Sequence, residues 1–122
     1  MKINFFKDDC LTTTSSTRFG ILDGEDGAPA FLEFDEMKTW VAQVENAQGL
    51  EVNFYALDGC VEVLNPDGSD AKRCDCFLTL ENASRNELIL IELKEKMSRW
   101  MEEGIMQLKA TIDLFNENYD LI

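Results

Sequence analysis

Hydrophobic and polar residues follow a helical period in two parts of the chain. The spacing of apolar residues predicts a first amphipathic helix over about 34–48, with Asp35 as its N-cap and Gly49 after its end. The apolar face of this helix would carry Met37, Trp40, Val41 and Val44. A second stripe predicts a helix over about 98–116, and its members are Met101, Ile105, Leu108, Ile112 and Phe115.

Between the two helices the period changes to two, which is typical of strands. The expected strands cover about 50–56, 60–64, 73–80 and 87–94. Tight-turn residues separate the first three of them, at Asp58-Gly59 and over 65–70. The middle of the chain is therefore expected to form an antiparallel meander.

Thr, Ser, Gly and Asp dominate residues 8–30, so we expect an irregular N-terminal segment over 1–30 with at most one or two edge strands. The 122 residues, 45% of them hydrophobic, suffice for one domain with a core. The predicted fold class is α/β of the α+β type. An antiparallel-to-mixed central sheet would lie between two helices, in a core over about 34–116.

Charge and composition exclude several classes of function. The chain has 24 acidic and 11 basic residues, a net charge of −13, so its overall field repels nucleic acids and anionic membranes. It has no histidine, which excludes Ser-His-Asp and Cys-His nucleophiles and His-ligated zinc or haem. Without an apolar run near the roughly 18 to 20 residues of a spanning helix, and without a signal-peptide pattern at its start, the protein is expected to be soluble and cytoplasmic.

The four cysteines are Cys10, Cys60, Cys74 and Cys76. In a cytoplasmic protein we expect them to be reduced and partly buried. A zinc site made of all four is a lesser alternative, because Cys74-x-Cys76 is the only close pair and zinc knuckles usually have two residues between their cysteines.

The last two predicted strands place titratable groups together. If their hairpin is centred between Ala83 and Ser84, Asp75 lies directly across from Glu92, with both side chains on one face. Lys94, two residues after Glu92, projects to the same face. Two adjacent carboxylates repel each other, and Mg2+ would relieve this repulsion while binding water and phosphate oxygens. Lys94 could then orient the attacking water or neutralise charge on the phosphoryl group.

These residues resemble the PD-(D/E)xK metal-dependent nuclease superfamily, the restriction-endonuclease-like fold, over about residues 34–116. The similarity lies in the runs RCDCFL (73–78) and LIELK (90–94) and in the helix containing Gln107-Leu108. It implies a core of a helix, three or four strands and a second helix. It also implies roles for four residues: Asp75 as the acidic metal ligand, Glu92 and Lys94 as the E-x-K pair, and Gln107 as the helix glutamine near the active site.

Two other aspartates remain alternatives. Pro66-Asp67 is a literal Pro-Asp pair but lies in a predicted turn, so Asp75 is the preferred ligand and Asp67 the alternative. Asp58 could approach the site from the neighbouring strand. Seven of the eleven basic residues could form a local patch in the C-terminal half: Lys72, Arg73, Arg85, Lys94, Lys96, Arg99 and Lys109.

The predicted function is a Mg2+- or Mn2+-dependent phosphodiester hydrolase that acts on DNA or RNA. Because the chain is so acidic, we expect it to bind nucleic acid weakly alone and to work in a larger nucleic-acid-processing or defence assembly, with a protein partner or a second copy. The alternative is a catalytically inactive, acidic interaction subunit that keeps the same fold and binds a basic protein or mimics nucleic acid.

Overall fold

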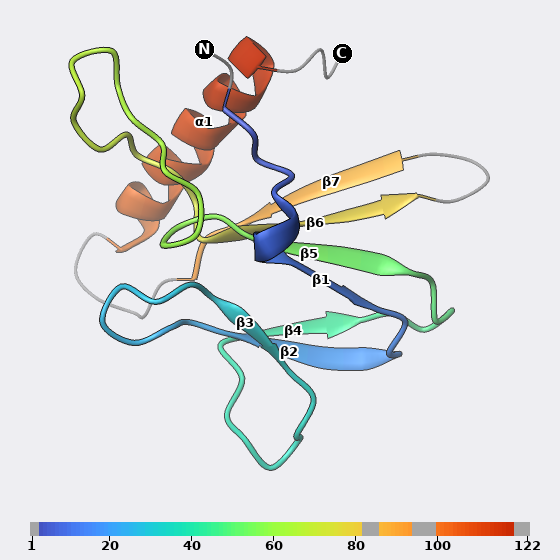
Figure 1. Cartoon of the computed structure of the whole chain (residues 1–122). Coiled ribbons are helices and arrows are strands. Elements are labelled where there is room, and N and C mark those ends of the chain that lie inside the picture. Colours follow the sequence, from blue (N-terminus) through green and yellow to red (C-terminus); the bar gives the residue numbers. More distant parts are fainter. Residues whose placement is uncertain (1–2, 82–85, 94–99, 119–122) are drawn as a thin grey trace.

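The computed structural model describes residues 3–81, 86–93 and 100–118, and within them it has two antiparallel sheets and a C-terminal α-helix (Figure 1). The elements are η1 (Asp8–Cys10), β1 (Leu11–Thr14), β2 (Arg18–Leu22), β3 (Phe31–Glu33), β4 (Ala42–Glu45), β5 (Val52–Ala56), β6 (Cys76–Glu81), β7 (Asn86–Ile91) and α1 (Trp100–Asn118). The larger sheet has the strand order β1-β5-β6-β7, and the smaller has β3-β2-β4. The α+β class is as predicted, but the described residues contain one α-helix where two were expected.

The prediction of a helix over 34–48 is wrong. This region forms a loop and strand β4, which pairs with β2. Met37 is 93% exposed, whereas the Trp40 ring packs on Gly20 of β2, so closely that a Cβ atom at position 20 would lie 2.1 Å from Trp40 Cγ. A helical spacing over so few residues is a weak signal, and tertiary packing overrides it here.

Residues 3–30 contain two strands, within the one or two expected, but only β1 is an edge strand. The Thr-rich strand β1 pairs with β5 at the edge of the larger sheet, consistent with the strand preference of β-branched residues. Strand β2 is the central strand of the smaller sheet, and Phe19 and Ile21 on it are fully buried. By contrast, the strand expected over 60–64 is reduced to a single bridge between Leu64 and Asp70.

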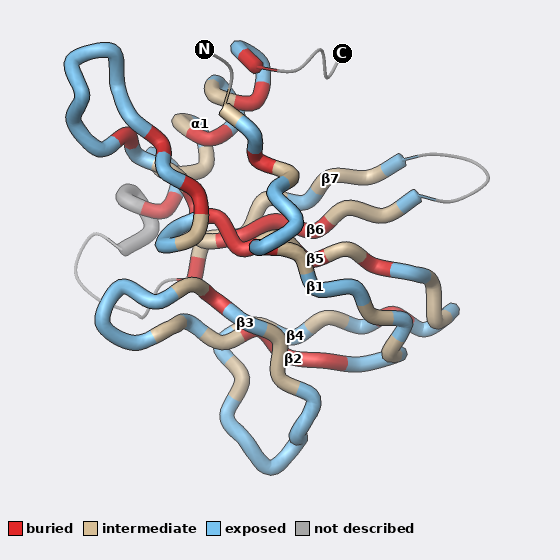
Figure 2. The backbone as a smooth tube through the Cα atoms, viewed as in Figure 1, coloured by how far each residue is buried: buried red, intermediate tan, exposed pale blue. Residues whose placement is uncertain are grey.

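The two faces of the larger sheet have different neighbours. On one face the rings of Tyr55 and Phe77 stack at 5.0 Å, and Phe77 contacts Phe115 of α1 at 5.2 Å; we call this the helix face. The alternate side chains on the other face belong to the same buried cluster as β2, and these are Val52, Phe54, Ala56, Cys76 and Leu78. Figure 2 shows the buried backbone concentrated at the start of β6 and along β2. The start of β6 thus lies in the buried core.

Candidate active site

The β6–β7 hairpin has the register that the sequence predicts. Cys76 and Ile91 are partners at the end of the ladder, so Asp75 and Glu92 are the next facing residues, just outside the two strands. The backbone N–H of Asp75 donates to the Ile91 carbonyl at 3.1 Å. Because strand side chains alternate, Asp75, two residues before Phe77, lies on the helix face.

Hydrogen bonds from three backbone N–H groups hold Asp75. Its carboxylate Oδ2 accepts from the N–H of Leu93 at 2.6 Å, which closes the hairpin where the ladder ends. Its carbonyl accepts from the N–H groups of Leu57 and Asp58 at 2.9 and 3.1 Å. The other carboxylate oxygen, Oδ1, accepts no hydrogen bond from the described part of the chain. Asp75 is therefore fixed in position at the end of the ladder.

Helix α1 brings Gln107 to Glu92. With its amide nitrogen directed at the carboxylate, Gln107 donates to both oxygens of Glu92, at 3.1 Å to Oε1. Asp75, Glu92 and Gln107 are all half-buried. The structure thus brings together three of the four residues that the resemblance singles out, and their catalytic role stays a prediction.

The buried residue Thr111 sets the position of α1 relative to this hairpin, and sequence reasoning missed it. Its hydroxyl accepts from the N–H of Cys74 at 2.6 Å and donates to the carbonyl of Gln107 at 2.8 Å. One side chain therefore links the residue before Asp75 to the backbone of Gln107. A threonine among the apolar positions of the helix was the available signal, because a buried hydroxyl needs a partner.

The remaining candidate residues have other positions. Lys94 lies outside the described residues. Asp67 accepts hydrogen bonds from the backbone N–H and hydroxyl of Ser69, which lower the pKa of its carboxyl, so it stabilises a turn in the loop that projects beside α1 (Figure 1). Asp58 forms an ion pair with Arg73 at 3.1 Å. The hairpin register places Asp75, rather than either of these aspartates, next to Glu92.

Two buried thiols lie next to the carboxylates. Burial, assisted by the charges of Glu92 and Asp75, raises the pKa of the Cys74 thiol to about 11. Burial, together with the negative charges of nearby groups that include Asp75, raises the pKa of the Cys76 thiol still further. Both thiols are fully buried and stay protonated at neutral pH, so neither acts as a thiolate nucleophile or ligand.

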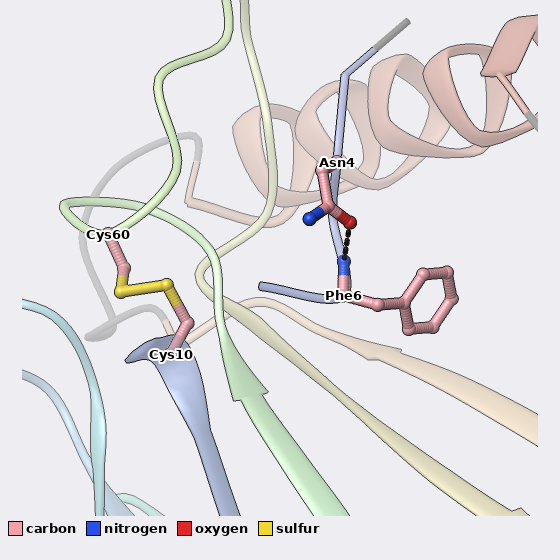
Figure 3. The surroundings of a disulfide bond; sticks show 4 residues. All are labelled: Asn4, Phe6, Cys10 and Cys60. Carbon is pink, nitrogen blue, oxygen red and sulfur yellow. Dashed lines mark hydrogen bonds between the residues drawn. A yellow bond between two sulfur atoms is a disulfide. The ribbon is translucent and has the colours of Figure 1, made fainter. Parts of the chain in front are cut away.

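The expectation that all four cysteines are reduced is wrong for Cys10 and Cys60, which form a disulfide across 50 residues of sequence (Figure 3). Their Cα atoms lie 6.0 Å apart, within the normal range. The bond joins the end of η1 to the turn after β5, which also contains Leu57 and Asp58. It also excludes a zinc site made of four cysteine thiolates.

The described side chains offer few potential ligands for a divalent cation. No group of three or more His, Cys, Asp or Glu side chains among residues 3–81, 86–93 and 100–118 is arranged to hold a metal. Mg2+ requires less, since it commonly binds one or two protein carboxylates and completes its octahedron with water and phosphate oxygens. Asp75 and Glu92 place two carboxylate side chains at facing positions beyond the end of the ladder.

Comparisons of the chain with protein-family profiles, with curated proteins and with solved structures found no match. In the described residues, no helix has both the length and the apolar character needed to cross a bilayer.

Proposed function

We propose that this protein is a Mg2+- or Mn2+-dependent phosphodiester hydrolase, a nuclease of the PD-(D/E)xK type, with its active site at the open end of the β6–β7 hairpin. The observation that carries the proposal is that Asp75 and Glu92 occupy facing positions beyond the end of the β6–β7 ladder and that Gln107 of α1 donates to Glu92. The resemblance is drawn from the order of these residues along the chain. Their positions in the fold are a separate observation that supports the same proposal.

Each residue has a distinct part in the proposed site. Asp75, through Oδ1, and Glu92 would hold the metal ion, which when bound lowers the pKa of a water and stabilises charge on a phosphate. The Leu93 N–H fixes the Asp75 carboxylate, and the Gln107 amide orients that of Glu92, as partners of metal ligands commonly do. Lys94 would orient the attacking water or neutralise negative charge that develops on the phosphoryl oxygens.

The net charge of −13 limits what the chain can do alone, because nucleic-acid affinity depends mainly on phosphate neutralisation by Lys and Arg. We therefore propose that it works in a larger nucleic-acid-processing or defence assembly, where a basic protein partner or a second copy holds the nucleic acid. A cytoplasmic site of action is part of this proposal. There, the Cys10–Cys60 bond would be a transient, redox-dependent one, as most cytosolic disulfides are.

Metal-dependent cleavage tests the proposal. Plasmid DNA, single-stranded DNA and RNA are incubated with the protein, with and without the proteins that co-purify with it, in Mg2+, Mn2+ or EDTA. We expect cleavage that EDTA abolishes and that Glu92→Gln and Lys94→Ala each reduce by roughly 10²- to 10³-fold. Glu62→Gln, at an exposed position, is the matched control and should cleave normally.

Metal binding is a second measurement that does not depend on finding the substrate. A ligand of the folded state raises stability by mass action, so Mn2+ should raise the Tm of the wild type and of Glu62→Gln, but not that of Asp75→Asn combined with Glu92→Gln. The absence of both metal-dependent cleavage and Mn2+ stabilisation would refute the proposal.

The charge favours one other function, that of a non-catalytic interaction subunit that binds a basic protein or mimics nucleic acid. In that case Asp75→Asn and Glu92→Gln would leave the function in cells intact. Charge reversal at surface acids such as Asp8, Asp9 or Glu25 would abolish it. If the carboxylate variants behave like a deletion, this second function is excluded.

A further inference from the structure

Two neighbouring hollows lie along β7 and share Leu88. The first, of about 360 Å3, is almost wholly apolar and lies between β7 and α1; it is lined by Leu88, Leu90, Leu108, Ile112 and Phe115. The second, of about 550 Å3, extends from the start of β7 across β6 to β5 and is lined by Phe6, Asn53, Tyr55, Thr79, Leu80, Glu81, Asn86, Glu87 and Leu88. Together they form one groove on the helix face, apolar at the Leu90 end and polar at the Asn86 end.

Strand β7 is also an edge. It is the terminal strand of the larger sheet and forms its upper edge in Figure 1, and no strand in the described chain pairs with its outer side. It carries a run of apolar residues, of which Ile89, on the face away from α1, is 47% exposed. On the helix face, Ile112 of α1, which lines the first hollow, is 46% exposed. An apolar edge strand is a site for pairing with another extended chain.

Charge identifies the kind of chain that fits. The polar end of the groove combines the carboxylate of Glu81 with the rings of Phe6 and Tyr55. Acidic groups and aromatic faces both attract an ammonium or guanidinium group. With a net charge of −13, the whole protein favours a basic partner and opposes a second copy of itself.

We propose that β7 accepts an extended segment of a basic partner protein as an added antiparallel strand. Because β7 runs from Asn86 to Ile91, such a segment enters at the Leu90 end and leaves at the Asn86 end. Its first alternate side chains are apolar and fill the hollow against Leu108 and Ile112. Those that follow are Lys or Arg and reach Glu81. This interaction is independent of the proposed catalysis.

Binding of a labelled synthetic peptide tests the proposal. Valine alternates with threonine in its N-terminal half, and lysine alternates with threonine in its C-terminal half. We expect a Kd of roughly micromolar order that weakens with salt. Glu81→Lys should weaken binding by about tenfold or more, and Glu62→Lys, at an exposed position elsewhere, should have no more than a small general effect.

The apolar half has its own matched pair of variants. Ile112→Asp should weaken binding by about tenfold, whereas Met106→Asp, at an equally exposed position of α1 outside both hollows, should not. Hydrogen exchange provides a structural readout: the peptide should slow exchange in β7 but not in β1, the opposite edge of the same sheet.

Three results would overturn the proposal. If Glu81→Lys and Glu62→Lys weaken binding equally, the peptide binds through general charge attraction and not at this groove. Protection of β1 instead of β7 would place the peptide at the wrong edge. Self-association of the wild-type protein that Ile112→Asp abolishes would assign the groove to a second copy.

Discussion

The hydroxyl of Thr111 on α1 accepts a hydrogen bond from the backbone N–H of Cys74, 2.6 Å away and fully buried. Cys74 precedes Asp75, and the same hydroxyl donates to the carbonyl of Gln107. The relative position of a proposed metal ligand and of the helix glutamine therefore depends on one side chain. A buried core residue thus helps to position the residues of the proposed site.

Replacing Thr111 with valine should destabilise the fold. Valine keeps the shape but leaves the buried N–H of Cys74 without a partner, which costs about 1–3 kcal/mol. Urea unfolding of Thr111→Val gives the loss in the free energy of unfolding. Thr111→Ser keeps the hydroxyl and is the control, and it should lose less than the valine variant. Equal stability of wild type and Thr111→Val would contradict the assigned hydrogen bond.

Removing the Gln107 amide should weaken metal binding with little effect on stability. Gln107→Met keeps the length of the side chain but cannot donate to Glu92, and the loss of such a supporting partner typically costs roughly 10- to 100-fold in metal affinity. Titration of Mn2+ by calorimetry measures the Kd. Gln48→Met, at an exposed position, is the control. Unchanged Mn2+ affinity in Gln107→Met would remove Gln107 from the proposed site.

The sequence predicts the part of the fold in which local pattern and tertiary contacts agree. The alternation around Phe77 and the turn-like residues at the hairpin centre sufficed to pair Asp75 with Glu92, and the register is confirmed. The apolar stripe of α1 predicted a helix within about two residues of Trp100–Asn118. Within that stripe Phe115 is fully buried and Leu108 packs against the core, whereas Ile105 and Ile112 are exposed.

The prediction failed where a distant residue decides the structure. Nothing local to 34–48 indicates that Trp40 will pack on a glycine twenty residues earlier in the chain. Likewise, the partner of Cys10 is 50 residues away, and no spacing rule identifies it. The hydrogen bond from Cys74 to Thr111 spans a similar separation. Such long-range pairs are determined by the packing of whole elements, which a periodicity along the chain does not contain.

Adding a methyl group at Gly20 should disturb the smaller sheet. The new Cβ atom would overlap the Trp40 ring, and overpacking of this kind costs about 1–3 kcal/mol. Thermal unfolding of Gly20→Ala, Trp40→Ala and the double variant forms a mutant cycle. Without the ring, the Gly20→Ala penalty should disappear, giving a clear coupling between the two positions. Additive effects would contradict the packing of Trp40 on Gly20.

Reduction of Cys10–Cys60 should lower stability without unfolding the protein at room temperature. Closing a loop of this length stabilises the fold by about 4 kcal/mol in the chain-entropy description, which corresponds to roughly 10 to 15 °C in Tm. The measurement is Tm with and without a reductant. Cys10→Ser combined with Cys60→Ser should have the lower Tm in both conditions. Alkylation of four thiols in the unfolded, unreduced protein would show instead that the bond is absent.

Stability should fall at alkaline pH because of the two buried thiols. Burial raises the pKa of Cys74 from 9.0 to about 11, and that of Cys76 is raised as well. Above pH 9 the unfolded chain therefore releases these protons while the folded protein retains them, so the thiols contribute their full stability below pH 9 and lose it as the pH rises toward 11.

The expected loss is about 1 kcal/mol per thiol for each pH unit above 9, measured by urea unfolding between pH 8 and 11. Cys74→Ala combined with Cys76→Ala is less stable at neutral pH because it leaves cavities, but its free energy of unfolding should fall less steeply above pH 9. The remaining slope belongs to groups such as Tyr55, whose pKa is also raised by burial. Parallel curves for the wild type and this double variant would mean that the thiols ionise equally in the folded and unfolded states, against their complete burial.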